Sequence, residues 1–237
     1  MITSATGLAG TVGVVHIPLP AAVLWDMDGT LVDTEPEWIA TERALVTSHG
    51  GEWTDEDSKR LVGSALIEAG EYIRIRGRLP MTAEQVVDNM VQRLVERLKE
   101  SIIWRPGARE LLTDLRANGV PCALVTMSYR QLADVVVSAL PPDTFGAVIT
   151  GDEVVNGKPH PEPYLRAAGD LGVDIAECIV IEDSTTGARA GLASGARVVA
   201  APNVVDVQLP GIPKVSTLVG MGAAGLAAVA GAGRLPD

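Results

Sequence analysis

The 237-residue sequence predicts an α/β fold, a Rossmann-like parallel sheet with a helical domain inserted after its first strand. Three observations predict this fold. Short continuous apolar runs recur along the chain, helical patterns follow them, and one long segment between the first two runs has helical patterns alone. Continuous apolar runs, unlike alternating ones, are typical of parallel strands covered by helices on both faces. We therefore expect a doubly wound arrangement.

The expected strands are short apolar runs bounded by polar or small residues, as buried strands are. They span residues 22–25, 122–125, 147–149, 178–181 and 197–201. The helices expected between them span residues 107–118, 129–140, 163–171 and 186–194. Gly119 follows the first of these helices directly, where a glycine is suited to end a helix.

The segment 37–103 contains no strand-like run and predicts a helical cap. In its clearest helical pattern, V-V-D-N-M-V-Q-R-L-V-E-R-L, the apolar residues fall on one face. These residues are Val87, Met90, Val91, Leu94, Val95 and Leu98. We expect hinges near Pro36 and residues 104–107. The remaining divisions are an N-terminal extension (1–20), an α/β core (21–36 and 104–218) and a C-terminal tail (219–237).

Both ends of the chain are expected to be poorly ordered or loosely docked. Residues 1–20 have no basic run before an apolar one, so they do not resemble a secretory signal. The apolar stretch 218–233 consists mainly of Gly and Ala. It is also shorter than the roughly 20 residues that a bilayer-spanning helix needs.

Charge and cysteine usage narrow the expected partners and location. The chain has 30 acidic and 19 basic residues, a formal charge of -11, so we expect neither duplex nucleic acid nor an acidic membrane surface as a partner. Cys122 and Cys178 lie inside apolar runs and are expected to be buried free thiols. This usage is typical of a reducing cytoplasm. We expect a cytoplasmic monomer.

Polar side chains follow the expected strands at the point where each strand ends. The first strand runs into L-W-D-M-D-G-T-L-V-D-T-E-P, in which two carboxylates lie one residue apart. Burying an ionised carboxylate is unfavourable unless a positive group compensates it, so the pair predicts a metal ion, a shared proton or a turn that reaches solvent. Ligand crevices of parallel sheets lie at the carboxyl ends of strands. The side chains that meet there are Asp26, Asp28, Thr126, Ser128, Lys158, Glu182 and Asp183.

Each of these groups alone also has an ordinary structural explanation. D-x-D-G is a common turn, a loop lysine is commonly a solvated charge, and acids commonly begin helices. A calcium-binding EF-hand loop would place Glu37 at its twelfth position, but Leu31 stands at the sixth, where glycine is needed. The joint occurrence of these groups at successive strand ends favours one shared site.

The order of these groups resembles that of the haloacid dehalogenase superfamily. D-M-D-G-T-L resembles its first motif, L-V-T its second, the loop N-G-K-P-H-P its third, and E-D-S-T-T-G-A-R-A-G its fourth, over about residues 21–203. A helical insertion directly after the first motif is similar to the subfamily with a helical cap. That subfamily includes phosphoglycolate phosphatase-like and β-phosphoglucomutase-like enzymes.

The resemblance implies a role for each strand-end residue. Asp26 would attack phosphorus and form an aspartyl-phosphate, and Asp28 would be general acid and then general base. Thr126 and Lys158 would bind the phosphoryl oxygens, and Gly29 would let the backbone turn beside the phosphate. Mg²⁺ would be held by the Asp26 carboxylate, the Asp28 carbonyl and Asp183, with Glu182 as a further or more distant ligand.

The resemblance implies a magnesium-dependent phosphatase whose partner is a small phosphorylated metabolite. The dehalogenase and phosphonatase branches of the superfamily lack an aspartate two residues after the nucleophile. Asp28 stands at that position here, which favours phosphoryl transfer. A sugar-phosphate mutase is the first alternative, but Trp38 and Leu66 stand where β-phosphoglucomutase has a histidine and an arginine. A non-catalytic protein that binds divalent ions is the second. Trp38 is also a candidate substrate-binding residue of the cap. The run I-R-I-R-G-R from Ile73 is expected to be a solvated face, with contact to an anionic substrate as the alternative. Sugar phosphates, phosphoglycolate or glycerol phosphate, and nucleotides all stay open as substrates.

Overall fold

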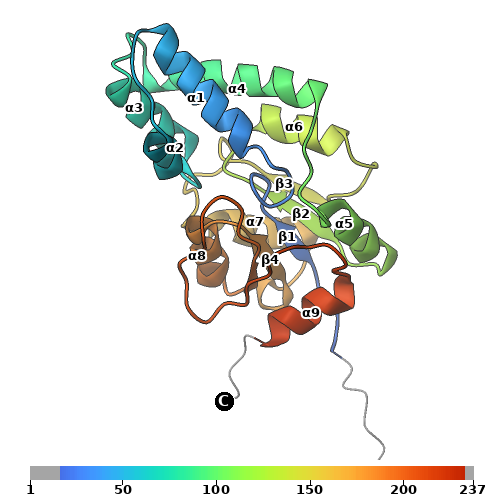
Figure 1. The fold of residues 1–237 in the computed structure, drawn as a ribbon. Coiled ribbons are helices and arrows are strands. Elements are labelled where there is room, and N and C mark those ends of the chain that lie inside the picture. Colours follow the sequence, from blue (N-terminus) through green and yellow to red (C-terminus); the bar gives the residue numbers. More distant parts are fainter. Residues whose placement is uncertain (1–16, 233–237) are drawn as a thin grey trace, which may run out of the picture.

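The computed structural model describes residues 17–232 and contains a wholly parallel sheet in the order β3-β2-β1-β4-β5 (Figure 1). The chain winds outward from β1 to one edge and then from β4 to the other. The point where the order reverses therefore lies beside β1, which is where ligands bind in such sheets. The strands are β1 (Val23–Trp25), β2 (Cys122–Val125), β3 (Ala147–Ile149), β4 (Ile179–Glu182) and β5 (Arg197–Ala200).

Helices cover both faces of the sheet, as the continuous apolar runs predict. Side chains of β1 point alternately into two apolar clusters, Val23 and Trp25 into one and Leu24 into the other. The first cluster contains α5 (Ala108–Ala117), α6 (Arg130–Ser138) and α9 (Ala223–Ala232), and the second contains α7 (Glu162–Leu171) and α8 (Thr185–Ser194). A short 3₁₀ turn, Ile175–Glu177, precedes β4. The predicted α/β class is confirmed.

A group of helices stands over the carboxyl ends of the strands (Figure 1). Thr54 and Thr82 begin two of them with capping boxes, in which side chain and backbone satisfy each other's free donors. The apolar face predicted for the last helix is buried, with Val95 half-buried, and this helix also packs against α6. The helices are α1 (Glu35–Ser48), α2 (Asp55–Leu61), α3 (Leu66–Arg76) and α4 (Ala83–Glu100).

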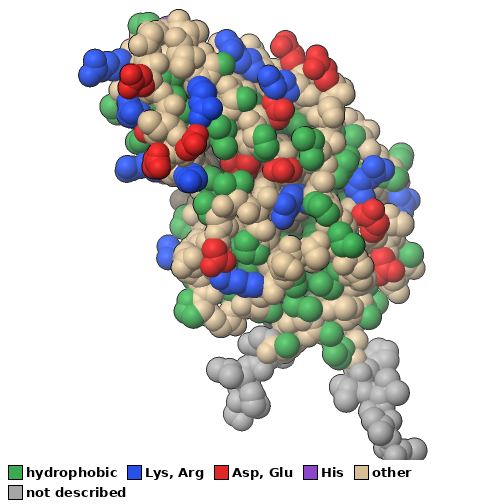
Figure 2. Space-filling view, viewed as in Figure 1, with side chains coloured by type: hydrophobic (Ala, Val, Ile, Leu, Met, Phe, Trp, Pro, Cys, Tyr) green, Lys and Arg blue, Asp and Glu red, His purple; other side chains and the backbone are tan. Residues whose placement is uncertain are grey.

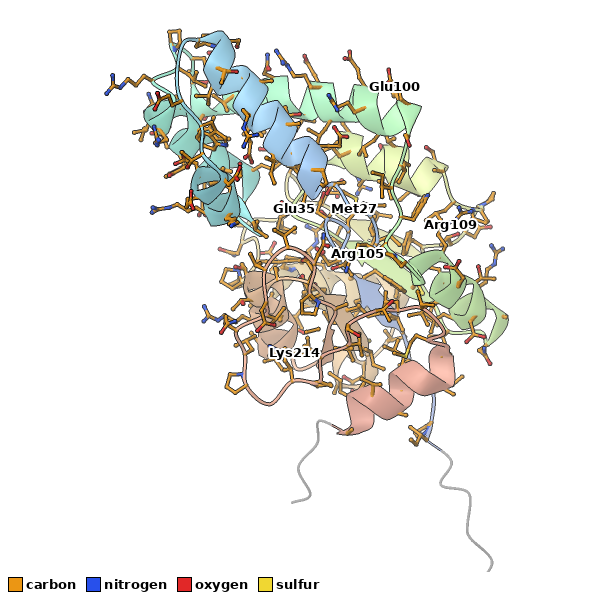
Figure 3. All side chains as sticks on the ribbon, viewed as in Figure 1. Met27, Glu35, Glu100, Arg105, Arg109 and Lys214 are labelled. Carbon is orange, nitrogen blue, oxygen red and sulfur yellow. The ribbon has the colours of Figure 1, made fainter. Side chains whose placement is uncertain are left out.

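Two segments of the chain connect these helices to the sheet, and they pair with each other. Val32 and Trp104 form an antiparallel bridge, flanked by backbone hydrogen bonds from Asp33 to Ile103 (2.7 Å) and from Arg105 to Leu31 (3.0 Å). The Arg105 side chain, at the junction in Figure 3, donates to Asn203. Asn203 in turn donates to Asp33. The connection is therefore a hydrogen-bonded ribbon, anchored to the loop after β5.

The prediction of a loosely docked C-terminal tail is wrong for its described part. Residues 223–232 form α9, and Leu226 and Ala227 are fully buried against the sheet layer. The backbone N–H of Ala223 donates to the Asp114 carboxylate of α5 at 2.6 Å. The glycines of this segment weaken an isolated helix whereas its alanines favour one, and the small side chains of both allow close packing here. Residues 233–237 and residues 1–16 of the predicted N-terminal extension lie outside the described residues.

Cys122 and Cys178 are buried and free, as predicted. In the part of the chain that the structure describes, every helix is too short or too polar to cross a bilayer. The monomeric state and the cytoplasmic location stay predictions.

Candidate active site

Asp26 is the first residue after β1, and its side chain has one satisfied and one unsatisfied oxygen. Its backbone N–H donates to the Ile181 carbonyl of the neighbouring strand, which continues the pairing of the sheet and fixes the residue's position. Oδ1 accepts a hydrogen bond from Lys158 Nζ at 2.7 Å. Oδ2 is buried and has no hydrogen-bond partner within the described chain. An unsatisfied buried carboxylate oxygen points to a ligand at this atom.

Lys158 comes from the loop after β3, and its ammonium group donates three hydrogen bonds to residues at the ends of β1, β2 and β4. Its Nζ donates to Asp26, to Glu182 (2.7 Å) and to the Val125 carbonyl (2.8 Å). Burial lowers the pKa of Lys158, but the two carboxylates more than offset this effect and hold the pKa above its ordinary value. The side chain therefore stays a cation at neutral pH.

Three buried carboxylates meet beside this lysine. Asp26, Glu182 and Asp183 each place an oxygen within 4.8 Å of the others. Burial and the charge of Glu182 raise the pKa of Asp26 to about 7, and burial and the charge of Asp26 raise that of Asp183. One lysine does not balance this negative charge. An all-oxygen cluster with surplus negative charge fits a hard divalent cation.

Glu182 is held differently from the two aspartates. Its Oε1 accepts from Lys158 and from the Tyr164 hydroxyl, both at 2.7 Å, and its Oε2 accepts from the Ser184 hydroxyl at 3.0 Å. A side chain at Gly187 would meet Glu182 Oε1 at 1.7 Å, so only glycine fits there. With both oxygens engaged, Glu182 is placed to orient Lys158, whereas Asp183 accepts no hydrogen bond from the described residues.

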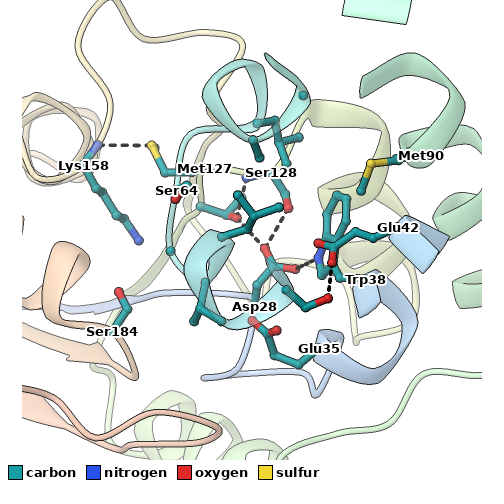
Figure 4. A pocket seen from close by; sticks show the side chains of 18 of the residues that line it. Asp28, Glu35, Trp38, Glu42, Ser64, Met90, Met127, Ser128, Lys158 and Ser184 are labelled. Carbon is teal, nitrogen blue, oxygen red and sulfur yellow. Dashed lines mark hydrogen bonds between the residues drawn. The ribbon is translucent and has the colours of Figure 1, made fainter. Parts of the chain in front are cut away.

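Asp28 accepts hydrogen bonds from both sides of the site (Figure 4). Oδ2 accepts from the hydroxyls of Thr126 (3.0 Å) and Ser128 (2.8 Å), at the end of β2. Oδ1 accepts from the Thr34 hydroxyl (2.7 Å) and from Trp38 Nε1 (3.3 Å), at the beginning of α1. Each oxygen is thus fixed by two donors, one pair in the core and one at the cap.

Gly29 is required because of its neighbour Asp183. Its φ of +82° lies in the left-handed region that favours glycine, and a Cβ there would stand 2.0 Å from Asp183 Oδ2. The motif glycine therefore lets the loop of Asp26 and Asp28 approach the carboxylate from β4. The need for glycine at position 29 therefore arises from contact with Asp183, in addition to the predicted closeness to phosphate.

These residues form the floor of a pocket of about 90 Å³ whose roof is the cap. Glu35, labelled at the junction in Figure 3, lines it with Trp38 and Glu42 from α1. A Cβ at Gly63 would lie 3.2 Å from that of Ser184, which shows how closely the roof approaches the floor. The further roof residues are Ser58, Leu61, Val62, Ser64, Leu66, Ala69, Gly70, Val87 and Met90.

The structure brings the residues predicted for the site together. The pocket lining includes Asp26, Asp28, Thr126, Lys158, Asp183 and Trp38, while Glu182 and Gly29 contact members of this set. Arg74 instead pairs with Glu71, outside the pocket lining.

Sequence reasoning missed Tyr164, Glu35 and Glu42 and gave Ser128 no role. Tyr164 and Glu42 lie within helical patterns that offered no signal beyond helix formation. Glu35 and Ser128 lie within a few residues of motif positions, which was the available signal.

Comparison with known proteins gives the family. Residues 23–201 match the model of the haloacid dehalogenase-like hydrolases. A bifunctional riboflavin kinase/FMN phosphatase from Arabidopsis thaliana is 34% identical over 78% of this chain, but this chain spans only about half (49%) of that protein. A phosphorylated carbohydrates phosphatase from Thermotoga maritima is 32% identical over 73% of this chain and 81% of its own.

Two solved structures share the fold. CbbY from Rhodobacter sphaeroides, in complex with phosphate, has a TM-score of 0.78 at 24% identity and covers 88% of this chain and 99% of its own. A β-phosphoglucomutase from Clostridium difficile has a TM-score of 0.75 at 22% identity, covering 86% of this chain and 93% of its own. Together with the family match over most of the sheet and cap, these findings show that the chain belongs to the haloacid dehalogenase-like hydrolases.

Proposed function

We propose that this enzyme is a magnesium-dependent phosphatase that hydrolyses a small phosphate monoester through an aspartyl-phosphate. The observation that carries the proposal is the buried, unpartnered Oδ2 of Asp26, on a carboxylate whose other oxygen is bound by Lys158 and which lies in one cluster with Asp183. A nucleophilic oxygen needs a free lone pair and a nearby positive charge that brings the anionic substrate to it.

The reaction has two displacements at phosphorus. In the first, an Asp26 oxygen bonds to phosphorus, the ester P–O bond breaks, and the leaving alcohol takes a proton from Asp28. In the second, Asp28 removes a proton from water, whose oxygen bonds to phosphorus as the bond to Asp26 breaks. Inorganic phosphate leaves and both aspartates return to their initial states. Four hydrogen bonds to Asp28 keep it oriented for both proton transfers.

Asp26, Asp183 and the Asp28 carbonyl would hold Mg²⁺, with Glu182 more distant because both its oxygens are engaged. When bound, Mg²⁺ supplies positive charge that offsets repulsion between the anionic nucleophile and the anionic phosphate. Lys158 and Thr126 lie beside Asp26 and Asp28, and each would exchange its present hydrogen bond to these carboxylates for one to a phosphoryl oxygen. Their positive charge and donor would stabilise the charge that develops there.

The relatives and the pocket support hydrolysis of a small ester. Relatives named for phosphatase activity include those on phosphorylated carbohydrates and hexitol phosphates. A pocket of about 90 Å³ covered by the cap suits a small phosphate ester.

The mutase stays the second candidate because the β-phosphoglucomutase structure shares the fold. Trp38 and Leu66 line the pocket where a mutase of the β-phosphoglucomutase type is expected to carry a histidine and an arginine, respectively. The non-catalytic alternative is disfavoured because every catalytic position predicted by the motifs is filled.

The test compares wild type with Asp26→Asn on p-nitrophenyl phosphate, with Mg²⁺ and with excess chelator. We expect turnover to fall at least about 10³-fold in the variant, because the nucleophile is lost, and to fall with chelator in wild type. Circular dichroism and a thermal melt show whether the variant is folded. Substantial turnover by a folded Asp26→Asn protein would overturn the covalent mechanism. A faster isomerisation of glucose 1-phosphate than hydrolysis of any ester would favour the mutase.

A further inference from the structure

The roof of the pocket carries negative charge without a cation. Among the described residues that line the pocket, Lys158 is the one basic side chain, and it is bound to the carboxylates of the floor. Glu35 and Glu42 of α1 line the roof side. The part of a substrate that extends beyond the phosphate therefore meets carboxylates and apolar side chains.

Glu42 has one oxygen fixed and one free. Its Oε2 accepts hydrogen bonds from Ser58 Oγ at 2.6 Å and from Trp53 Nε1 at 3.1 Å. These donors orient the carboxylate beside Trp38, as Figure 4 shows. Oε1 has no hydrogen-bond partner among the described residues, although Glu42 is only 5% exposed. An oriented and unpartnered acceptor on a largely buried side chain that lines a pocket is placed to accept from a donor on a ligand.

Glu35 is a second carboxyl group of the roof, and among the described residues it has no partner that would stabilise its charge. It is 8% exposed, and its carboxyl group makes no hydrogen bond within the described chain. Burial first, and then the charge of Asp28, raise its pKa to about 7. A second anionic group on the substrate would lie near Glu35 and Glu42, with no basic side chain of the described cap in the pocket lining to offset its charge.

None of the described basic residues of the cap lines the pocket, and four of its arginines pair with carboxylates outside the lining. Arg43 pairs with Asp55, Arg74 with Glu71 and Arg76 with Asp57. Arg97 pairs with Glu37 on the outer surface. On the face shown in Figure 2, basic and acidic side chains are interspersed over the cap. Arg76 and Arg78 are exposed, as expected for a solvated face, and no residue of 73–78 lines the pocket, so the alternative of contact with an anionic substrate is not supported.

We propose that the pocket takes monophosphates whose alcohol portion is uncharged and bears hydroxyl groups, and that Glu42 is a specificity-determining residue. This inference rests on the phosphatase function proposed above. The free oxygen of Glu42 accepts a hydrogen bond from a substrate hydroxyl. The same oxygen repels a carboxylate or second phosphate, for which the pocket offers no compensating cation.

The direct test uses two substrates that differ in one terminal group. Sorbitol 6-phosphate and 6-phosphogluconate share a six-carbon chain and a phosphate, but the first ends in a hydroxymethyl group and the second in a carboxylate. We expect wild-type kcat/KM to be at least about tenfold higher for sorbitol 6-phosphate, because like charges in a buried site repel. An equal or reversed preference would overturn the inference.

Glu42→Gln removes the charge and keeps an oxygen that can accept from Ser58 and Trp53. We expect the preference ratio to fall at least about threefold, because the repulsion of the carboxylate is removed. Glu52→Gln is the matched control, since Glu52 is exposed and outside the pocket lining; its ratio should equal that of wild type. An unchanged ratio in folded Glu42→Gln would refute the role of Glu42.

Two measurements keep the outcome decisive. If Glu42→Gln does not fold, Glu35→Gln replaces it, because Glu35 has no hydrogen bond to lose; its ratio should also fall. If wild type hydrolyses neither these esters nor p-nitrophenyl phosphate, the proposed phosphatase function fails. If wild type hydrolyses them without preference, only the inference on specificity fails.

Discussion

The two sides of the pocket are both buried and both rich in carboxylates, but only one of them contains a cation. On the floor, Lys158 donates to Asp26 and Glu182 and so binds the loop after β3 to two strand ends. On the roof, Glu35 and Glu42 face the same space with no basic partner among the described lining residues. Burial penalises charge on both sides, and only the floor offsets that penalty within the protein.

This difference teaches that the two sides have separate tasks. The floor is organised for fixed charge, since a cation, surplus carboxylates and an unpartnered oxygen suit a metal ion and a phosphate. The roof suits an uncharged group with hydrogen-bond donors. On the proposed function, the residues of the sheet carry out the chemistry and those of the cap select the substrate.

The largest expected effect is that of Asp28→Asn, which should lower turnover by about 10²- to 10⁴-fold. The reason is loss of proton transfer with little loss of structure, because the hydroxyls of Thr126 and Ser128 can rotate and accept from the new amide. Turnover on esters with poor leaving groups and a thermal melt are the measurements. A folded variant with unimpaired turnover would remove Asp28 from the chemistry and weaken the division between floor and roof.

Lys158→Met should destabilise the protein by about 3–5 kcal/mol, because it leaves two buried carboxylates without their cation. Urea unfolding in the presence of chelator measures this change. Lys214→Met is the control, since Lys214 pairs with Asp206 on the surface and its loss should cost less than about 1 kcal/mol. Equal effects of the two substitutions would show that the floor does not depend on its cation.

The smallest effect concerns the roof and depends on pH. The pKa of Glu35 is raised from 4.5 to about 7 in the folded protein, so the folded state binds more protons than the unfolded state between these values. Stability contributed by this group is therefore full below pH 4.5, is lost as the pH rises to about 7, and stays lost above it. Glu35→Gln removes this loss.

We expect Glu35→Gln to stabilise the metal-free protein by about 1–3 kcal/mol more at pH 8 than at pH 4.5, relative to wild type. Urea unfolding at the two pH values is the measurement, and Glu52→Gln, exposed to solvent, should show no such difference. A gain that is the same at both pH values would mean that the roof does not penalise negative charge. The contrast between the two sides would then be lost.

Much of the floor was predictable because each residue follows an apolar run. In a parallel sheet, strand ends lie side by side whatever the length of chain between them, so Asp26, Thr126, Lys158 and Asp183 had to approach one another. The roof was less predictable. Its residues depend on how α1 rotates and tilts over the sheet, and a helical pattern does not reveal which charged residue of the helix faces a pocket.

Two further features show the same limit. Tyr164 lies within a helical pattern, and only the packing of α7 against the sheet places its hydroxyl on Glu182. The C-terminal segment has a mixed helix preference, since its alanines favour a helix and its glycines disfavour one, and its few large apolar side chains suggested loose docking. The contact of Leu226 with the core and the bond from Ala223 to Asp114 come from tertiary structure and override that preference.

The hydrogen bonds of Asp28 also have a consequence for timing. Its Oδ2 is bound by the sheet side of the site, whereas Oδ1 is bound by Thr34 and Trp38, which lie beyond the paired connecting ribbon. A movement that lifts α1 from the sheet would release Oδ1 and leave Oδ2 in place. On the proposed mechanism, Asp28 would therefore be held through both oxygens for proton transfer only while the cap is closed. Water that enters an open site would meet a carboxylate held through Oδ2 alone, so closure of the cap would determine when proton transfer can occur.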